Sequence, residues 1–193
     1  MTAASKKFEK VLAIHCHTTG VSKGDDITAN NQPLTVALGL LNTSTLKFEE
    51  TVSVQIKFDS KKYTWDSRLE DIHGITSDLR DDGETFEDAA AILGEFIYKH
   101  FGVKDSIPVF GYRANSFHIP FLNKVFHSVG LHFKFDDRAL DLFPLMAVMG
   151  QFSSRDMFDF LEIDQSQPLS SLYIIKEYLK VYRMFRTLIQ TSL

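Results

Sequence analysis

Residues 11–16 (VLAIHC) form an apolar run that ends in a polar, turn-forming stretch, and this run constrains the fold more than any other feature. Its length and composition predict a buried β-strand, which we place at about 10–16. Side chains two residues apart on a strand point to the same face. His15 and His17 are therefore expected side by side, just before Thr18 and Thr19. Titratable side chains at the end of a buried strand make this point the first candidate site.

Together with the first strand, the remaining pattern predicts three β-segments, followed by strands that alternate with helices. Residues 34–58 read as two strands joined by a turn. Residues 85–102 read as a helix, with Thr85 and Asp88 as a capping pair. Further strands are expected at 106–113 and 131–137, and further helices at 115–130, 140–150, 153–163 and from after Pro168 to the C-terminus. This order predicts an α/β fold in which a mixed β-sheet is flanked by helices.

Some residues suggest where the helices begin and which face they bury. Asn115 and Ser153 are expected to cap the helices that follow them. The apolar periodicity of the last helix predicts an inner face of seven residues. They are Ile174, Tyr178, Val181, Tyr182, Phe185, Leu188 and Ile189.

Composition narrows the class of protein. A chain of 193 residues suits a single domain spanning 1–193. The net charge of -4 argues against a dedicated nucleic-acid binder, because phosphate contacts require a basic balance. The single cysteine, Cys16, excludes an internal disulfide and a cysteine-rich zinc site. No apolar run reaches the roughly 20 residues of a membrane span, and the N-terminus lacks a secretory pattern, so we expect a cytoplasmic protein without membrane contact.

Four stretches, taken in order, carry a family resemblance. VLAIHCHTTG (11–20) is similar to a first-strand motif Asp-x-Glu-Thr-x-Gly, and DIHGITSDL (71–79) to a following His-Gly-Ile-Thr segment. VFGYRANSFHIPFLNKVF (109–126) and FSSRDMFDFLEID (152–164) are similar to the second motif and to the segment before the third. The chain thus resembles the DEDDh 3′–5′ exonucleases, which are DnaQ-like members of the ribonuclease-H-like superfamily. The pattern is nearest to the compact, phage-encoded form, so a viral origin is expected.

The chain departs from this family at the residues that carry its chemistry. The resemblance implies two divalent metals held by four carboxylates, with a histidine that activates water. Here His15 and His17 stand at the Asp and Glu of the first motif, and His118 stands at the Asp of the second. In the third motif, Leu172 falls at the histidine and Glu177 at the aspartate. We therefore expect no catalytic residue, no cofactor and no exonuclease activity.

Three interpretations of these substitutions remain open. The first is a pseudo-enzyme that keeps the fold and binds other proteins as an adaptor or scaffold, in phage replication, protein sorting or counter-defence within the host cytoplasm. The second is a metalloprotein, in which His15, His17, His118 and Glu177 bind zinc or another transition metal. The first interpretation is the one we adopt.

The third interpretation is a module that binds nucleic acid weakly and does not cut it. Tyr112 and Arg113 replace the His-Asn pair of the second motif, and they are the candidate ligand-binding residues. The other histidines receive structural assignments. His73 is expected to support its loop. His100, His127 and His132 lie near predicted element ends, where surface or capping roles are expected.

Overall fold

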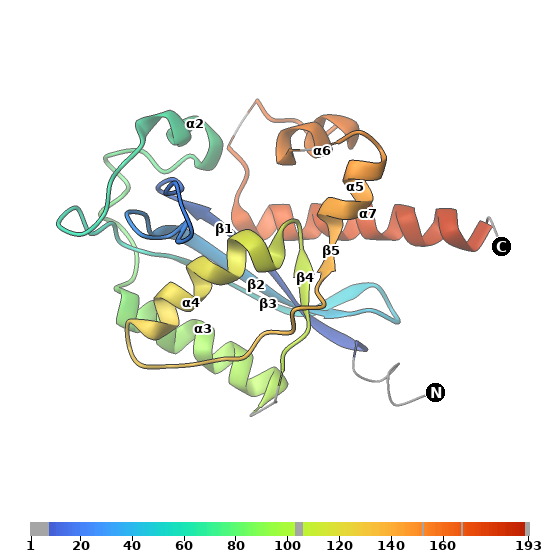
Figure 1. The fold of residues 1–193 in the computed structure, drawn as a ribbon, viewed down its shortest axis with the longest axis horizontal. Helices are drawn as coiled ribbons and strands as arrows, with labels where there is room; N and C mark the ends of the chain where they lie inside the picture. Colours follow the sequence, from blue (N-terminus) through green and yellow to red (C-terminus); the bar gives the residue numbers. More distant parts are fainter. Residues whose placement is uncertain (1–7, 103–105, 152, 167, 192–193) are drawn as a thin grey trace.

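The computed structural model describes residues 8–102, 106–151, 153–166 and 168–191. Its centre is a five-stranded sheet in the order β3-β2-β1-β4-β5 (Figure 1). The strands are β1 (Lys10–Thr18), β2 (Pro33–Asn42), β3 (Lys47–Gln55), β4 (Val109–Gly111) and β5 (Leu140–Asp141). β2 runs antiparallel to β1 and β3, whereas β1, β4 and β5 run parallel, so the expected mixed sheet is confirmed.

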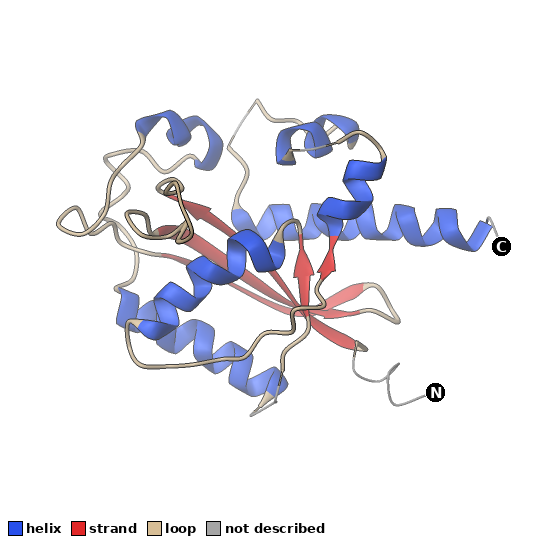
Figure 2. Ribbon diagram, viewed as in Figure 1, coloured by secondary structure: helices blue, strands red, loops and turns tan. Residues whose placement is uncertain are grey.

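Helices cover both faces of this sheet (Figure 2). One core lies between the sheet and α3 and α4, and the other lies between the sheet and α5, α6 and α7. Because β1 is covered on both sides, residues 11–14 are apolar without interruption instead of alternating with polar residues. The helical elements are η1 (Ser67–Leu69), α2 (Glu70–His73), α3 (Phe86–Phe101), η2 (Ala114–His118), α4 (Ile119–His127), α5 (Leu142–Val148), α6 (Ser154–Phe160) and α7 (Ser171–Thr191).

The alternation of β1 decides which side each residue faces. Leu12, Ile14 and Cys16 belong to the core under α3 and α4. Val11 and Ala13 belong to the core under α7. His15 and His17 continue the second series, so both histidines are directed to the α7 side at the end of the strand.

The predicted caps are right in two helices and wrong in one. Thr85 caps α3 together with Asp88, and Ser153 forms a capping box at the start of α6. Asn115, however, caps no helix, because its side chain donates hydrogen bonds to the backbone carbonyls of Asp136 and Asp137.

Asp141 takes over the capping that was expected of Asn115. Its carboxylate accepts hydrogen bonds from the backbone of Arg113 (2.8 Å) and Ala114 (3.0 Å), at the start of η2, and from Phe143 (2.9 Å), at the start of α5. Arg113 has a left-handed backbone, with φ of 55°. The Asp141 carboxylate at the end of β5 therefore caps the starts of both η2 and α5. Its contact with η2 joins distant parts of the chain and cannot be seen in the local sequence.

Three further predictions need correction. Residues 131–137 do not form a strand: they contribute one isolated bridge, between Ile107 and Phe135, and Phe133 and Phe135 pack on the core beside α3 and α4. The fifth strand is Leu140–Asp141, within the segment expected to be helical. Leu188 and Ile189 are 50% and 57% exposed, because the end of α7 runs past the sheet (Figure 1). Among the described residues, no helix is long and apolar enough to cross a membrane.

Gly39 sets how closely α7 approaches the sheet. A Cβ atom at this position of β2 would lie 2.7 Å from the Phe48 ring and 3.2 Å from Ile175 of α7. We expect Gly39→Ala to lower the free energy of unfolding by about 1–3 kcal/mol, because the packed core must shift. Urea unfolding measures this loss. Ser53→Ala, on the exposed surface of β3, is the control and should change stability by no more than about 0.5 kcal/mol. Equal stability of the Gly39→Ala variant and the wild type would show that α7 is not held at this spacing.

Candidate functional site

The fold brings together the three histidines of the first two motifs. His15 and His17 come from β1 and His118 from η2. The ring centroid of His15 lies 4.9 Å from that of His17 and 4.6 Å from that of His118. His73 of α2 joins them, with its ring 5.9 Å from that of His17. These four residues are called the histidine cluster below.

Two members of the cluster bond to the backbone. Nδ1 of His118 accepts a hydrogen bond from the N–H of Cys16 at 3.1 Å, and Nδ1 of His73 accepts one from the N–H of Ile75 at 3.0 Å. A ring that accepts at Nδ1 carries its proton on Nε2 when it is neutral. His118 therefore ties η2 to β1, and His73 stabilises the turn after α2.

The other two members bond to hydroxyl groups. Nδ1 of His15 lies 2.9 Å from the hydroxyl of Tyr178. Nδ1 of His17 lies 3.3 Å from the hydroxyls of Thr35 and Ser171. Ser171 and Tyr178 are seven residues apart on α7, which places them on one helix face. No role was predicted for Ser171 from the sequence, although its spacing from the predicted core residue Tyr178 was a usable signal.

Burial keeps the cluster uncharged. His15 and His17 are 7% exposed and His118 is 3% exposed. Desolvation is the main cause that lowers the pKa of His17 and His118 to about 3, and neighbouring histidines add to it. The pKa of His15 falls well below its usual value for the same reasons. At neutral pH the three motif positions thus carry no charge, either positive or negative.

The third-motif residues lie elsewhere on α7. Leu172 packs against the core under that helix, and Glu177 is buried with a carboxylate oxygen 2.7 Å from the Lys180 ammonium. Among the contacts of the described residues, α7 reaches the cluster through Ser171 and Tyr178. Within the same part of the chain, no group of three or more His, Cys, Asp or Glu side chains is arranged to hold a metal ion. The residues present do not fit a two-magnesium centre, which needs clustered carboxylate oxygens.

The two candidate ligand-binding residues have different environments. Tyr112 is buried, with its ring 5.7 Å from that of Phe143. Arg113 is exposed, and its guanidinium lies 4.4 Å above the Phe143 ring. Tyr112 is therefore part of the core, whereas Arg113 presents a stacked cation at the surface near the start of η2.

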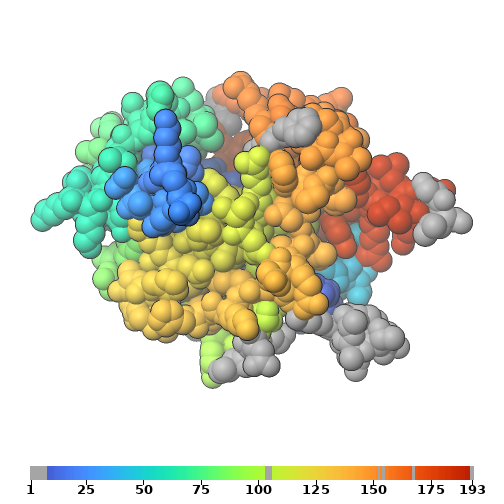
Figure 3. Space-filling view, viewed as in Figure 1, coloured from blue at the N-terminus to red at the C-terminus, as the bar shows by residue number. Residues whose placement is uncertain are grey.

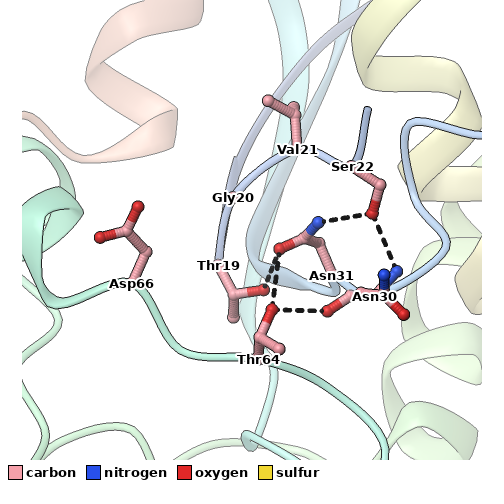
Figure 4. A pocket seen from close by; sticks show the side chains of 8 residues that line it. All are labelled: Thr19, Gly20, Val21, Ser22, Asn30, Asn31, Thr64 and Asp66. Atoms are coloured by element: carbon pink, nitrogen blue, oxygen red, sulfur yellow. Dashed lines mark hydrogen bonds between the residues drawn. The ribbon is translucent and has the colours of Figure 1, made fainter. Parts of the chain in front are cut away.

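A small polar pocket lies beyond the end of β1. It measures about 250 Å³ and lies between the loop after β1 and residues 64–66. Figure 3 shows these loops, in blue and teal, next to each other on one face. Figure 4 shows Asn31 at its centre, bonded to Ser22 and Thr19. The lining is mostly hydroxyl and amide, and its carboxylate, Asp66, is paired with Arg68, so the pocket offers little negative charge.

Comparison with known proteins assigns the fold through structure. No protein-family model matches the chain, and no curated protein matches it. Solved structures of exonucleases do match. The nuclease domain of 3'hExo, a DEDDh family member bound to rAMP, gives a TM-score of 0.66 at 19% identity, over 93% of this chain and 92% of that chain. The molecule therefore has the ribonuclease-H-like α/β fold of the DEDDh exonucleases.

Two structures of exonuclease I also match the fold of this chain. The product-bound form gives a TM-score of 0.71 at 15% identity, over 93% of this chain and 43% of that chain. The zinc-bound form of the E. coli ExoI–ssDNA complex gives a TM-score of 0.70 at 15% identity, over 93% of this chain and 41% of that chain. This chain thus spans less than half the length of exonuclease I, and at these identities the likeness concerns the fold alone.

The buried histidines predict that the protein loses stability in acid. Their pKa is near 6.5 in the unfolded chain and about 3 in the folded chain for His17 and His118. The unfolded state therefore binds more protons between these values, and stability falls as pH drops from 6.5 toward 3. Each of the two residues contributes a loss of about 2 kcal/mol by pH 5.

Urea unfolding at several pH values checks this dependence. We expect His17→Gln to remove about one proton from the slope of unfolding free energy against pH. Ser53→Ala, at an exposed position without a titratable side chain, should leave the slope unchanged. Identical slopes for the wild type and His17→Gln would show that His17 does not titrate in the way its burial requires.

Proposed function

We propose that this chain is an exonuclease-fold protein that does not hydrolyse nucleic acid and that binds other proteins as an adaptor or scaffold. One observation carries the first part of the proposal. The positions of the first two motifs hold His15, His17 and His118, which are buried, neutral and bonded through Nδ1 to the surrounding structure.

We expect no magnesium-dependent chemistry, because the histidine cluster carries no negative charge to hold the metal ions. Magnesium requires oxygen ligands in near-octahedral geometry, and the two-metal mechanism requires a pair of ions. Three carboxylates replaced by three neutral imidazoles remove about three negative charges from the place where two dications would bind. The third-motif carboxylate Glu177 is paired with Lys180 and does not compensate.

A protein-binding role accounts for the retained fold. Large apolar side chains are exposed on α2, at the upper left of Figure 1, and on α5, to the right of its centre. Val148, at the end of α5, is 88% exposed, and Ile72 of α2 is 59% exposed. Contiguous apolar patches mark surfaces that meet a partner, and these two side chains are the ones to test for such a role. The phage-like sequence pattern suggests replication, protein sorting or counter-defence in the host cytoplasm as the setting.

Binding of nucleic acid without cleavage is the second candidate, and one observation favours it. Arg113 is exposed and stacked on Phe143, which suits contact with a phosphate or a base. Similar structures are described as bound to rAMP and to ssDNA. The net charge of -4 weighs against strong binding. We therefore rank this candidate below the adaptor.

A cleavage assay tests the first part of the proposal. We expect purified protein to release no nucleotide above the enzyme-free blank from end-labelled single-stranded DNA or RNA with Mg²⁺ or Mn²⁺, because no carboxylate pair holds the ions. His17→Gln should behave in the same way. The proposal of inactivity fails if the wild type cuts and this variant, with its fold confirmed by circular dichroism, is at least about 100-fold slower.

A pull-down with two variants tests the adaptor role. In the cell that makes this protein, we expect a stoichiometric partner that is retained by His15→Gln. We expect the same partner to bind about tenfold more weakly to Val148→Asp, because a charge at an interface must be desolvated. A partner lost only in His15→Gln, or the lack of any stoichiometric partner, would argue against an adaptor surface at α2 and α5.

A further inference from the structure

Two histidines outside the cluster form a pair on the surface. His127 is the last residue of α4, and His132 follows five positions later. Their ring centroids lie 4.7 Å apart, and the ring planes are inclined at 41°. Both residues are exposed. Their positions near predicted element ends suggested surface or capping roles, and the turn between them brings the two rings together.

The turn after α4 holds the pair in place. Gly130 adopts φ of 73°, the left-handed conformation that ends many helices. The N–H of Leu131 donates to the carbonyl of Phe126 at 3.0 Å, and the N–H of Gly130 donates to that of His127 at 3.2 Å. Phe133, next to His132, packs on Phe126 with ring centroids 4.8 Å apart. The backbone that carries both imidazoles is therefore fixed on each side of the pair.

The spacing of the two rings suits a shared metal ion. A tetrahedral zinc ion bound by two imidazole nitrogens at about 2 Å holds the two ring centroids about 5 Å apart. The observed 4.7 Å is close to this distance, and the inclined rings do not form a parallel stack. Exposure of both side chains leaves room for water as the remaining ligands. The negative end of the α4 dipole, to which His127 belongs, also favours a cation.

We propose that His127 and His132 form a surface binding site for a divalent transition-metal ion, with zinc as the best candidate. Imidazole nitrogen suits zinc, copper and nickel, whereas magnesium and calcium need oxygen ligands. The site is separate from the histidine cluster, whose Nδ1 atoms are bonded within the core. It does not depend on the proposed adaptor function.

Isothermal titration of the untagged, EDTA-treated, full-length chain with zinc chloride tests this site. We expect one zinc ion per chain. His127→Gln and His132→Gln should each weaken binding at least about tenfold, because the second ligand is no longer held beside the first. His17→Gln in the histidine cluster should bind zinc as the wild type does. All three variants should be compared by circular dichroism and, without metal, by melting temperature.

Two results would overturn the proposal. One is the lack of zinc binding by the wild type, or binding that both surface variants retain. The other is binding lost only in His17→Gln, which would assign the ion to the histidine cluster. Loss in both surface variants, with unchanged folding and with binding retained in His17→Gln, supports the surface pair.

Discussion

The burial of β1 between two helical layers is the constraint on which the rest of the structure depends. Leu12 and Ile14 face the core under α3 and α4, while Val11 and Ala13 face the core under α7. Any side chain at the end of this strand enters a place where charge is costly unless it is paired. A metal-dependent nuclease balances clustered carboxylates there with dications. In this chain neutral imidazoles occupy that position.

The imidazoles also connect the layers. His15 bonds to Tyr178 of α7, His17 lies between hydroxyls of β2 and α7, and His118 accepts from the β1 backbone. A buried polar atom without a partner costs about 1–3 kcal/mol, so these contacts matter for stability as well as for geometry. The histidine cluster is thus part of the core. The same burial links stability to pH.

The fold was more predictable from the sequence than the contacts of the histidine cluster. The order of strands and helices was predictable because apolar periodicity and helix caps such as Thr85 are local signals. The bonding of His17 to Ser171 was not, because the two residues are 154 positions apart. The contacts of α7 were not predictable either, because the sequence gives the position of a residue on a helix but not its partner in another segment. Glu177 pairs with Lys180, and Tyr178 bonds to His15.

The sequence by itself determined the mixed sheet with flanking helices and the position of His15 and His17 on one face of a buried strand. These follow from periodicity and residue type, which are properties of neighbours along the chain. Tertiary structure decided which nitrogen atoms are bonded, that the cluster is uncharged, and that His127 and His132 stand together. Burial and contacts between distant segments set these properties, because desolvation depends on everything that surrounds a group.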